Sequence, residues 1–363
     1  MIEDFVKKHV AVSSLESPEH AKGGDPRVIT CTWFIGKRCN YDCSYCASFY
    51  HDNYSPHVTK ESAYNFIDQL DIYAQSQKKK FKMNITGGEP FVNPDFLNIL
   101  AYAKQKPSLT QLAVVSNGSI PLQIYLKATK YLTNITISLH LEQSQQVTER
   151  TIDNILKLNQ IKTLFCNVNL MLLPGKLNQV KDIITIFEKN NVKYITRKIE
   201  PPFEDTTQVI KKGDTQAIKR EQETFVYDKI HGKNQNKQDL ETRLQEYYSQ
   251  EELEFLSTKE VNWNNIRLHR ETDMLELNTD ELKARGLNTW LGWQCFIGID
   301  SLYIQHNGEV YRGNCLLGGK LGDIGGEINW PSQPLVCPAT SCGCNADMMV
   351  RKTKDPKYKL LID

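Results

Sequence analysis

Between residues 28 and 199, short runs of β-branched and apolar residues alternate with longer amphipathic stretches. Six runs are predicted as strands: VITCTWFI (28–35), FKMNIT (81–86), LAVVS (112–116), NITISL (134–139), LFCNVNLML (164–172) and VKYITRKI (192–199). The stretches between them show helical spacing of apolar residues. Such alternation is typical of parallel strands joined by helical crossovers. We therefore expect an α/β fold, a partial (β/α)6 barrel, with functional residues at the carboxyl ends of its strands.

Composition divides the chain into four parts. The barrel is assigned to 28–200, after an N-terminal extension at 1–27. Residues 201–289 are rich in Lys, Gln, Glu and Asn, which predicts a charged, mostly helical insertion or linker, either a lid over the barrel or a connecting excursion. In 290–363, glycines separate short strands around Asn307-Gly308. This pattern predicts a small C-terminal α+β domain that contains a hairpin.

The charge balance gives no reason to expect a nucleic acid or a membrane as partner. The net charge is +1 at pH 7 over 363 residues, so the chain lacks the field that attracts a polyanion. The N-terminus has no basic region followed by an apolar run, and no stretch of about 18 apolar residues occurs. We therefore expect a cytoplasmic protein.

The chain has 10 cysteines and shows no export signal, so we expect reduced thiols rather than disulfides. Eight of them fall into two sets, one at 39–46 and one at 295–344. Such clustering is what a metal needs if a short segment is to present several ligands. Cys31 and Cys166 lie instead in apolar strand patterns, and we expect them in the core.

The first set has the spacing C-x3-C-x2-C over Cys39, Cys43 and Cys46. Three thiolates can wrap one corner of a four-iron cluster, which leaves one iron without a protein ligand and open to a small molecule. A structural zinc is the alternative, with His51 or His57 as its fourth ligand.

A second motif, Gly87-Gly88-Glu89-Pro90, follows the second predicted strand. By itself it is an ordinary turn. At a strand end, however, Gly87 and Gly88 let the backbone approach a ligand closely, and the Glu89 carboxylate can accept a hydrogen bond from an ammonium group.

In this order, the cysteine loop after the first strand and the Gly-Gly-Glu-Pro turn after the second resemble the radical S-adenosylmethionine (radical SAM) superfamily. The resemblance implies a 4Fe-4S cluster whose open iron binds the amino and carboxylate groups of S-adenosylmethionine. It implies that an electron from the cluster cleaves the sulfonium to a 5'-deoxyadenosyl radical, which abstracts a substrate hydrogen. It also implies a reductant such as flavodoxin or ferredoxin.

Further positions match this family one by one. Asn117 follows the third strand and Ser138 ends the fourth, where relatives hydrogen-bond the ribose or the methionyl part. Arg150 stands where relatives place an arginine against the S-adenosylmethionine carboxylate, as a bidentate pair would require. His140 takes a position where many relatives carry Asp, so its role stays open. The cofactor-binding residues implied by the resemblance are Tyr45, Gly87, Gly88, Glu89, Asn117, Ser138 and Arg150.

Two strands carry further polar candidates. Asn167 and Asn169 share one face of the fifth strand and suit either a ligand or neighbouring strands as partners. An inward-pointing Arg197 would contact an anion or pair with Glu200.

The second cysteine set resembles the auxiliary-cluster domains called SPASM and twitch. It has fewer cysteines than the full SPASM pattern, which favours one auxiliary 4Fe-4S cluster. Cys295 and Cys315 are the expected ligands, and two more come from Cys337, Cys342 and Cys344. Structural zinc is again the competing interpretation.

The resemblance implies an oxidoreductase or related enzyme, but it does not give the substrate. We expect a small molecule or short peptide to be oxidised or rearranged, with the auxiliary cluster as electron acceptor. Maturation of a ribosomally made peptide is the alternative, although the residues before Cys39 are too few for the peptide-recognition domain of many such enzymes. A two-cluster electron-transfer or redox-sensing protein is the hypothesis from another class.

Overall fold

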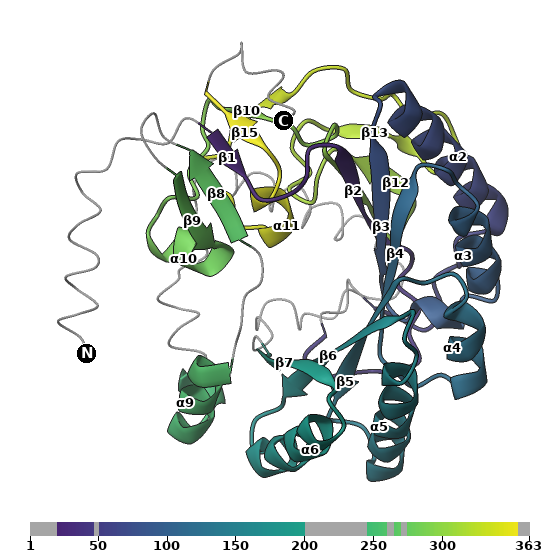
Figure 1. The fold of residues 1–363 in the computed structure, drawn as a ribbon, viewed down its shortest axis with the longest axis vertical. Coiled ribbons are helices and arrows are strands. Elements are labelled where there is room, and N and C mark those ends of the chain that lie inside the picture. Colours follow the sequence, from purple (N-terminus) through teal and green to yellow (C-terminus); the bar gives the residue numbers. More distant parts are fainter. Residues whose placement is uncertain (1–19, 47–50, 200–244, 260–264, 270–273, 355–363) are drawn as a thin grey trace.

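The structure, a computed structural model, describes residues 20–46, 51–199, 245–259, 265–269 and 274–354. Its larger sheet contains six parallel neighbouring strands in chain order, and helices line the outer side of this curved sheet (Figure 1). The α/β partial barrel and its six predicted strands are thereby confirmed.

The strands are β2 (Val28–Phe34), β3 (Lys80–Thr86), β4 (Leu109–Ser116), β5 (Asn134–His140), β6 (Phe165–Leu172) and β7 (Lys193–Lys198). The intervening helices are α2 (Lys60–Ser76), the 3-10 helix η1 (Pro90–Val92), α3 (Phe96–Lys104), α4 (Leu122–Ala128), α5 (Gln145–Asn159) and α6 (Leu177–Lys189).

Each barrel strand gives one face to the helices and the other to the concave side of the sheet. In β2, Ile29, Cys31 and Trp33 are buried in the main core, while Thr30 and Thr32 on the other face are half-buried. Because side chains alternate along a strand, the apolar positions pack under helices such as α2 and the polar ones face the concave side. Cys31 and Cys166 are both buried, as predicted.

Three C-terminal strands extend the barrel sheet: β11 (Ser301–Ile304), β12 (Glu309–Tyr311) and β13 (Lys320–Asp323). The hairpin predicted at Asn307-Gly308 joins β11 to β12. The barrel sheet continues across the predicted boundary at residue 290, since β11 pairs in parallel with β2 and Leu302 lies opposite Cys31. Leu302 and Ile304 are buried in the barrel core, and this burial explains why the hairpin joins the barrel edge.

A second sheet collects short strands from distant parts of the chain, in the order β14-β10-β15-β1-β8-β9. The N-terminal extension contributes β1, so it is not a separate element. The mostly helical prediction for 201–289 is wrong at β8 and β9, where Ile266 and Leu268 are buried between exposed polar neighbours with the period of a strand. The strands are β1 (His20–Lys22), β8 (Asn265–His269), β9 (Met274–Asn278), β10 (Gln294–Cys295), β14 (Leu335–Val336) and β15 (Lys352–Thr353), accompanied by α10 (Thr279–Ala284) and α11 (Asn345–Met348).

One more helix, α9 (Gln250–Lys259), agrees with the helical prediction. The segment before it is fixed at the carboxyl ends of β6 and β7. There the Tyr248 hydroxyl donates to Leu172 O at 2.8 Å and accepts from Ile199 N at 2.7 Å. The predicted lid falls mainly on 200–244 and lies outside the described residues.

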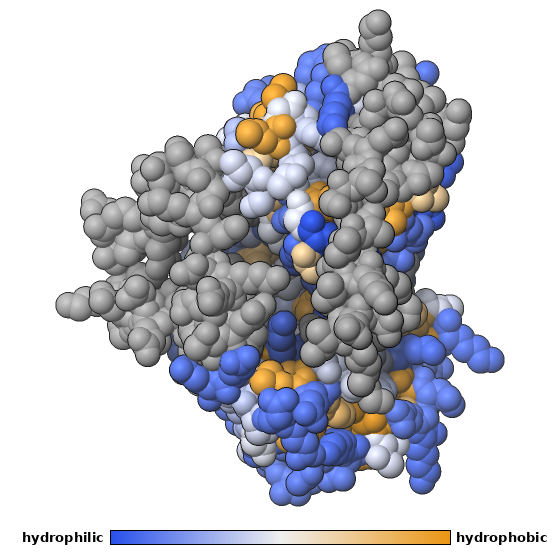
Figure 2. All heavy atoms as spheres, turned by 90° about the vertical axis from the view of Figure 1, so that its left-hand side faces the viewer, coloured by the Kyte–Doolittle hydropathy of each residue, from blue (hydrophilic) through white to orange (hydrophobic). Residues whose placement is uncertain are grey.

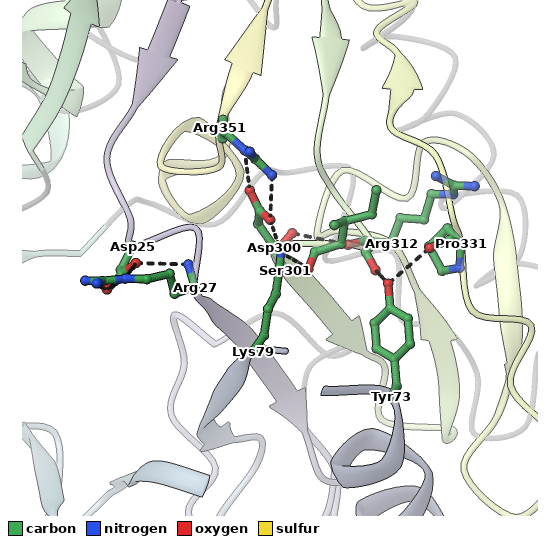
Figure 3. A network of polar contacts seen from close by, with 11 residues as sticks. Asp25, Arg27, Tyr73, Lys79, Asp300, Ser301, Arg312, Pro331 and Arg351 are labelled. Atoms are coloured by element: carbon green, nitrogen blue, oxygen red, sulfur yellow. Dashed lines mark hydrogen bonds and ion pairs between the residues drawn. The ribbon is translucent and has the colours of Figure 1, made fainter. Parts of the chain in front are cut away.

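A buried carboxylate and two half-buried cations join the barrel to the C-terminal strands at a place here called the barrel–tail junction: Asp300, Lys79 and Arg351 (Figure 3). Asp300 is 6% exposed and accepts from Lys79 Nζ at 2.5 Å and from Arg351 Nε at 3.0 Å. Close by, the Tyr73 hydroxyl of α2 donates to Pro331 O at 3.0 Å. Lys79 precedes β3, Asp300 precedes β11 and Arg351 precedes β15. The Asp300 carboxylate therefore connects three segments of the chain.

The described helices include none that is both long and apolar enough to span a bilayer. Figure 2 views the side of the molecule where the small sheet and α9 lie, and the visible described side chains there are predominantly hydrophilic, with hydrophobic ones in small separate groups.

Candidate functional site

The cysteine loop follows β2 at the carboxyl ends of the barrel strands, and the Gly-Gly-Glu-Pro turn after β3 is hydrogen-bonded to its first residues. Gly88 N donates to Gly36 O at 2.8 Å, and Glu89 N donates to Arg38 O at 2.9 Å. Cys39 N donates to Asp52 O at 2.7 Å. Backbone hydrogen bonds from two segments therefore fix the start of the loop that carries the thiols.

The two glycines of this turn are required by the close approach of the loops. A Cβ added at Gly87 would lie 2.6 Å from Gly36 O, and one at Gly88 would lie 2.3 Å from Lys37 O. Any side chain would push the turn away from the cysteine loop. The predicted contact of these glycines with S-adenosylmethionine stays a prediction.

The loop leaves the thiols of Cys39 and Cys46 partly exposed and buries that of Cys43. Cys39 Sγ accepts from Tyr41 N at 3.4 Å and from Asn117 Nδ2 at 3.9 Å, and Cys43 Sγ accepts from Gln143 Nε2 at 3.8 Å. The pKa of Cys43 is raised to about 12, mainly by burial and in smaller part by the nearby Glu142, Cys46 and Cys39. Donors to the sulfurs and mutually close thiols suit an iron-sulfur cluster, in which the thiolates are shared with iron.

The zinc alternative finds less support in this loop. His51 Nε2 lies 3.1 Å from Asp42 Oδ1, and His57 Nε2 lies 3.4 Å from an Arg38 nitrogen, so each predicted fourth ligand faces another side chain. Within the described ranges, no three His, Cys, Asp or Glu side chains are arranged to hold a single metal ion.

Glu89 points into the protein. Its carboxylate is 2% exposed and accepts from Phe91 N at 3.1 Å, Ser116 Oγ at 2.9 Å and Asn117 N at 2.7 Å. Burial raises the pKa of Glu89 to about 7 against the effect of these donors. The side chain thus fastens the turn after β3 to the end of β4, and its predicted contact with an ammonium group stays a prediction.

The other predicted cofactor residues lie at different distances from the loop. Asn117 is buried against it and donates to Asn40 Oδ1 at 2.9 Å. Ser138 is half-buried on the concave face of β5. Arg150 is exposed on α5, near enough for its charge to act on Tyr41, whose pKa is raised by burial. Asn117 and Arg150 are therefore brought near the loop, whereas Ser138 forms no hydrogen bond with it within the described residues.

His140, whose role the sequence left open, contacts the cysteine loop directly. Its Nδ1 lies 2.6 Å from the Tyr45 hydroxyl, and the two rings stack with centroids 5.9 Å apart. Next to it, Glu142 accepts from Ser44 N at 2.8 Å. Burial lowers the pKa of His140 to about 4, so the ring is neutral at pH 7. The signal in the sequence was its spacing of two residues from Ser138, which puts both side chains on one face of β5.

The second cysteine set is gathered around one pocket beneath the small sheet. Four thiols line it together with Trp290, Ile297, Leu317 and Leu335, and these thiols belong to Cys295, Cys315, Cys337 and Cys342. Cys344 is not among the lining residues, and its Sγ accepts from Asn314 Nδ2 at 3.0 Å. Cys344 nevertheless lies close to Cys342, whose Sγ is 4.0 Å from Cys344 O, so the choice of the ligands among Cys337, Cys342 and Cys344 stays a prediction.

Two charged side chains that the sequence analysis missed also line this pocket. The buried Asp347 carboxylate accepts from Cys315 N at 2.6 Å. The Lys352 ammonium donates to Asp347 O at 2.6 Å and Val350 O at 2.8 Å. Burial raises the pKa of Cys295 to about 11, and Lys352 is the largest opposing influence. One lysine among many carries no mark in the sequence, so only the fold could identify it.

Comparison with known proteins gives a family match to the barrel. Residues 33–185 match the model of the Radical SAM superfamily. The GTP 3',8-cyclase of Klebsiella pneumoniae (strain 342) is 33% identical over 82 residues, which are 22% of this chain and 24% of that enzyme. The GTP 3',8-cyclase of Vibrio parahaemolyticus serotype O3:K6 is 30% identical over 103 residues, 28% of this chain and 30% of that enzyme. The chain thus spans less than a third of the length of these relatives.

Two solved structures have a similar arrangement at low identity. Native anSMEcpe with bound AdoMet is 13% identical, with a TM-score of 0.46 over 83% of this chain and 79% of that one. Streptococcus suis SuiB bound to S-adenosylmethionine is 14% identical, with a TM-score of 0.46 over 91% of this chain and 70% of that one.

Proposed function

We propose that this chain, whose residues 33–185 match the Radical SAM superfamily model, cleaves S-adenosylmethionine reductively and abstracts a hydrogen from a polar substrate. Cys39, Cys43 and Cys46 would hold the 4Fe-4S cluster. When bound, the cluster supplies the electron that breaks the sulfonium and yields a 5'-deoxyadenosyl radical. The observation that carries the proposal is the loop itself, which presents three clustered thiols while His51 and His57 face other side chains.

The residues around the loop hold it in a fixed position. The backbone of Gly88 and Glu89 supports its start, and Asn117 donates to Asn40 inside it. On the opposite side, His140 and Glu142 at the end of β5 support Tyr45 and Ser44. A loop supported from several strands keeps its thiols oriented without a fourth protein ligand, which is what an open coordination position requires.

The polarity of the concave face supports a polar substrate. Neighbouring barrel strands present hydroxyl and amide groups there that form no hydrogen bond within the described part of the chain, and they belong to Thr32, Asn84, Thr136, Ser138, Asn167 and Asn169. Arg197 of β7 lies opposite Met171, on the same face, and Glu200 falls outside the described residues. Polar groups without partners are suited to bind a hydrogen-bonding ligand. A small, carbohydrate-like metabolite or a short peptide meets that requirement.

We further propose that Cys295, Cys315, Cys337 and Cys342 hold one auxiliary 4Fe-4S cluster. Four thiols around one pocket complete a ligand set, so no iron would be left open there. Hydrogen abstraction leaves a carbon radical, and its oxidation requires an acceptor for one more electron. This electron count supports oxidation rather than a redox-neutral rearrangement.

The decisive experiment is anaerobic reconstitution with iron and sulfide, reduction with dithionite, and detection of 5'-deoxyadenosine from S-adenosylmethionine. We expect cleavage by the wild-type protein, none by Cys43→Ala, and retained cleavage by Cys166→Ala, which removes a buried thiol outside both sets. A protein that binds iron but never cleaves S-adenosylmethionine would instead be a two-cluster electron-transfer protein, and the proposal would fail.

A further inference from the structure

Among the described residues that line the four-cysteine pocket, Lys352 carries the single positive charge. It is 1% exposed. Lysine is among the residues least often fully buried, because removing an ammonium group from water is unfavourable unless its hydrogen bonds are replaced. Its position against four thiols therefore calls for an explanation beyond packing.

The geometry around Lys352 matches the charged form of the side chain. An ammonium group has three N–H donors and no acceptor. Nζ donates to three backbone carbonyls, Asp347 O at 2.6 Å, Met348 O at 3.2 Å and Val350 O at 2.8 Å. The Trp290 ring lies 5.3 Å from Nζ, within the range of a cation–π contact. All donors are used and the group is held in place, so the charge has a fixed position.

We infer that Lys352 is a fixed positive charge that raises the reduction potential of the auxiliary cluster. The inference rests on the proposed function, since it requires that the four cysteines hold that cluster. A cluster bound by four thiolates is an anion, and its reduced form carries one more negative charge. A nearby cation in a water-poor pocket therefore stabilises the reduced form more than the oxidised form. The step concerned is a one-electron reduction by an external reductant, in which no bond forms or breaks.

A negatively charged residue in the same pocket does not cancel the charge of Lys352. The Asp347 carboxylate is buried and lines the same pocket, but it accepts from Asn314 N and Cys315 N. It forms no ion pair with Lys352, whose ammonium is bound to backbone carbonyls. Lys352 therefore keeps its positive charge available to the pocket instead of neutralising a side chain.

The test measures the potential of the auxiliary cluster alone, in the full-length chain with Cys39, Cys43 and Cys46 replaced by Ala. Lys352→Gln keeps a side-chain donor and removes the charge, Lys352→Arg keeps the charge, and Lys354→Gln is the matched control on an exposed lysine. Each protein is titrated with dithionite under argon and followed by electron paramagnetic resonance. We expect Lys352→Gln to weaken reduction at least tenfold, a shift of about 59 mV to lower potential for one electron. Lys352→Arg and Lys354→Gln are expected to stay near the parent value.

Each outcome decides the inference. An unchanged potential in Lys352→Gln would overturn it and leave the proposed function intact. Absence of iron from the parent protein would overturn the proposed auxiliary cluster and the inference with it. If Lys352→Gln loses the cluster while Lys352→Arg keeps it, the charge serves to hold the thiolates instead of setting the potential, and the inference is overturned. If both lose it, the residue acts through its shape and the inference fails.

Discussion

The two cysteine sets differ in how the chain gathers their thiols. Cys39, Cys43 and Cys46 come from one loop, and two of these three are only partly buried. The four thiols of the pocket come from three separate segments, and three of the thiols are buried. A single loop approaches a cluster from one side and leaves the other side free, whereas separate segments can surround it. The first arrangement suits binding of a small molecule, and the second suits an electron carrier closed to ligands.

The largest expected effect tests whether the two sets hold separate clusters. The reconstituted wild-type protein should contain about eight irons, as two 4Fe-4S clusters require. Replacing Cys39, Cys43 and Cys46 by Ala should remove about four of them. Cys337→Ala or Cys342→Ala should each remove about four as well, while Cys344→Ala should remove none, as colorimetric iron analysis would report. Zinc in the tail, or about four irons in the wild type, would contradict a second cluster.

The next effect concerns the barrel–tail junction, which joins the two regions. Asp300→Ala leaves two largely covered cations, whose side chains are 9% and 15% exposed, without their carboxylate, so we expect a loss of about 3 kcal/mol in the free energy of unfolding. Asp323→Ala is the control, because its ion pair with Lys320 is exposed and worth about 1 kcal/mol or less. Urea denaturation followed by fluorescence measures both. Equal losses in the two variants would mean that the junction does not hold the regions together.

A smaller effect is expected beside the loop of Cys39, Cys43 and Cys46, where we propose that S-adenosylmethionine binds. Arg150→Ala should weaken S-adenosylmethionine binding about tenfold to a hundredfold without loss of iron, because a charge-assisted contact is worth about 1.5–3 kcal/mol. Lys157→Ala on the same helix removes an exposed ion pair with Asp153 and serves as the control. Equilibrium dialysis of the reconstituted proteins gives the affinities. Unchanged binding in Arg150→Ala would show that the family position was assigned to the wrong residue.

The smallest effect concerns Glu89, which supports only the loop of Cys39, Cys43 and Cys46. Its pKa is about 7 in the folded protein and near 4.5 in an unfolded chain, because burial favours the neutral form. Its contribution to stability is therefore complete below about pH 4.5 and is lost as the pH rises through 7. Between pH 6 and 8 the free energy of unfolding should fall by about 1 kcal/mol from this group. Chemical denaturation at the two pH values should show this fall in the wild type and not in Glu89→Gln.

The barrel could be predicted from sequence because its strands are long, apolar and regularly spaced. Ile29, Cys31 and Trp33 alternate with polar residues in β2, and this local pattern is enough to identify a strand. The small sheet could not be predicted in the same way, since β10, β14 and β15 contain two residues each and depend on pairing between distant segments. Local patterns carry no information on such pairing.

The same limit applied to the candidate site. The spacing of Cys39, Cys43 and Cys46 is local, and the sequence therefore identified them. Cys342 and Cys344 are separated by a single glycine, and only the course of the folded chain puts one in the pocket and the other beside Asn314. Lys352 and Asp347 owe their importance to burial, which their own sequence neighbourhood does not reveal.

The parallel pairing of β11 with β2 also determines the order in which the parts of the protein can fold during synthesis. On the ribosome, β2 emerges long before β11, and its outer edge stays unpaired until β11 has been synthesised. Contacts this far apart in sequence form late and slow the folding of a domain. An unpaired apolar strand edge is meanwhile a template for association with other chains. A fragment that ends before Ser301 is therefore expected to sediment as aggregate on centrifugation instead of yielding a free barrel, so the C-terminal hairpin acts as the late step that closes the fold.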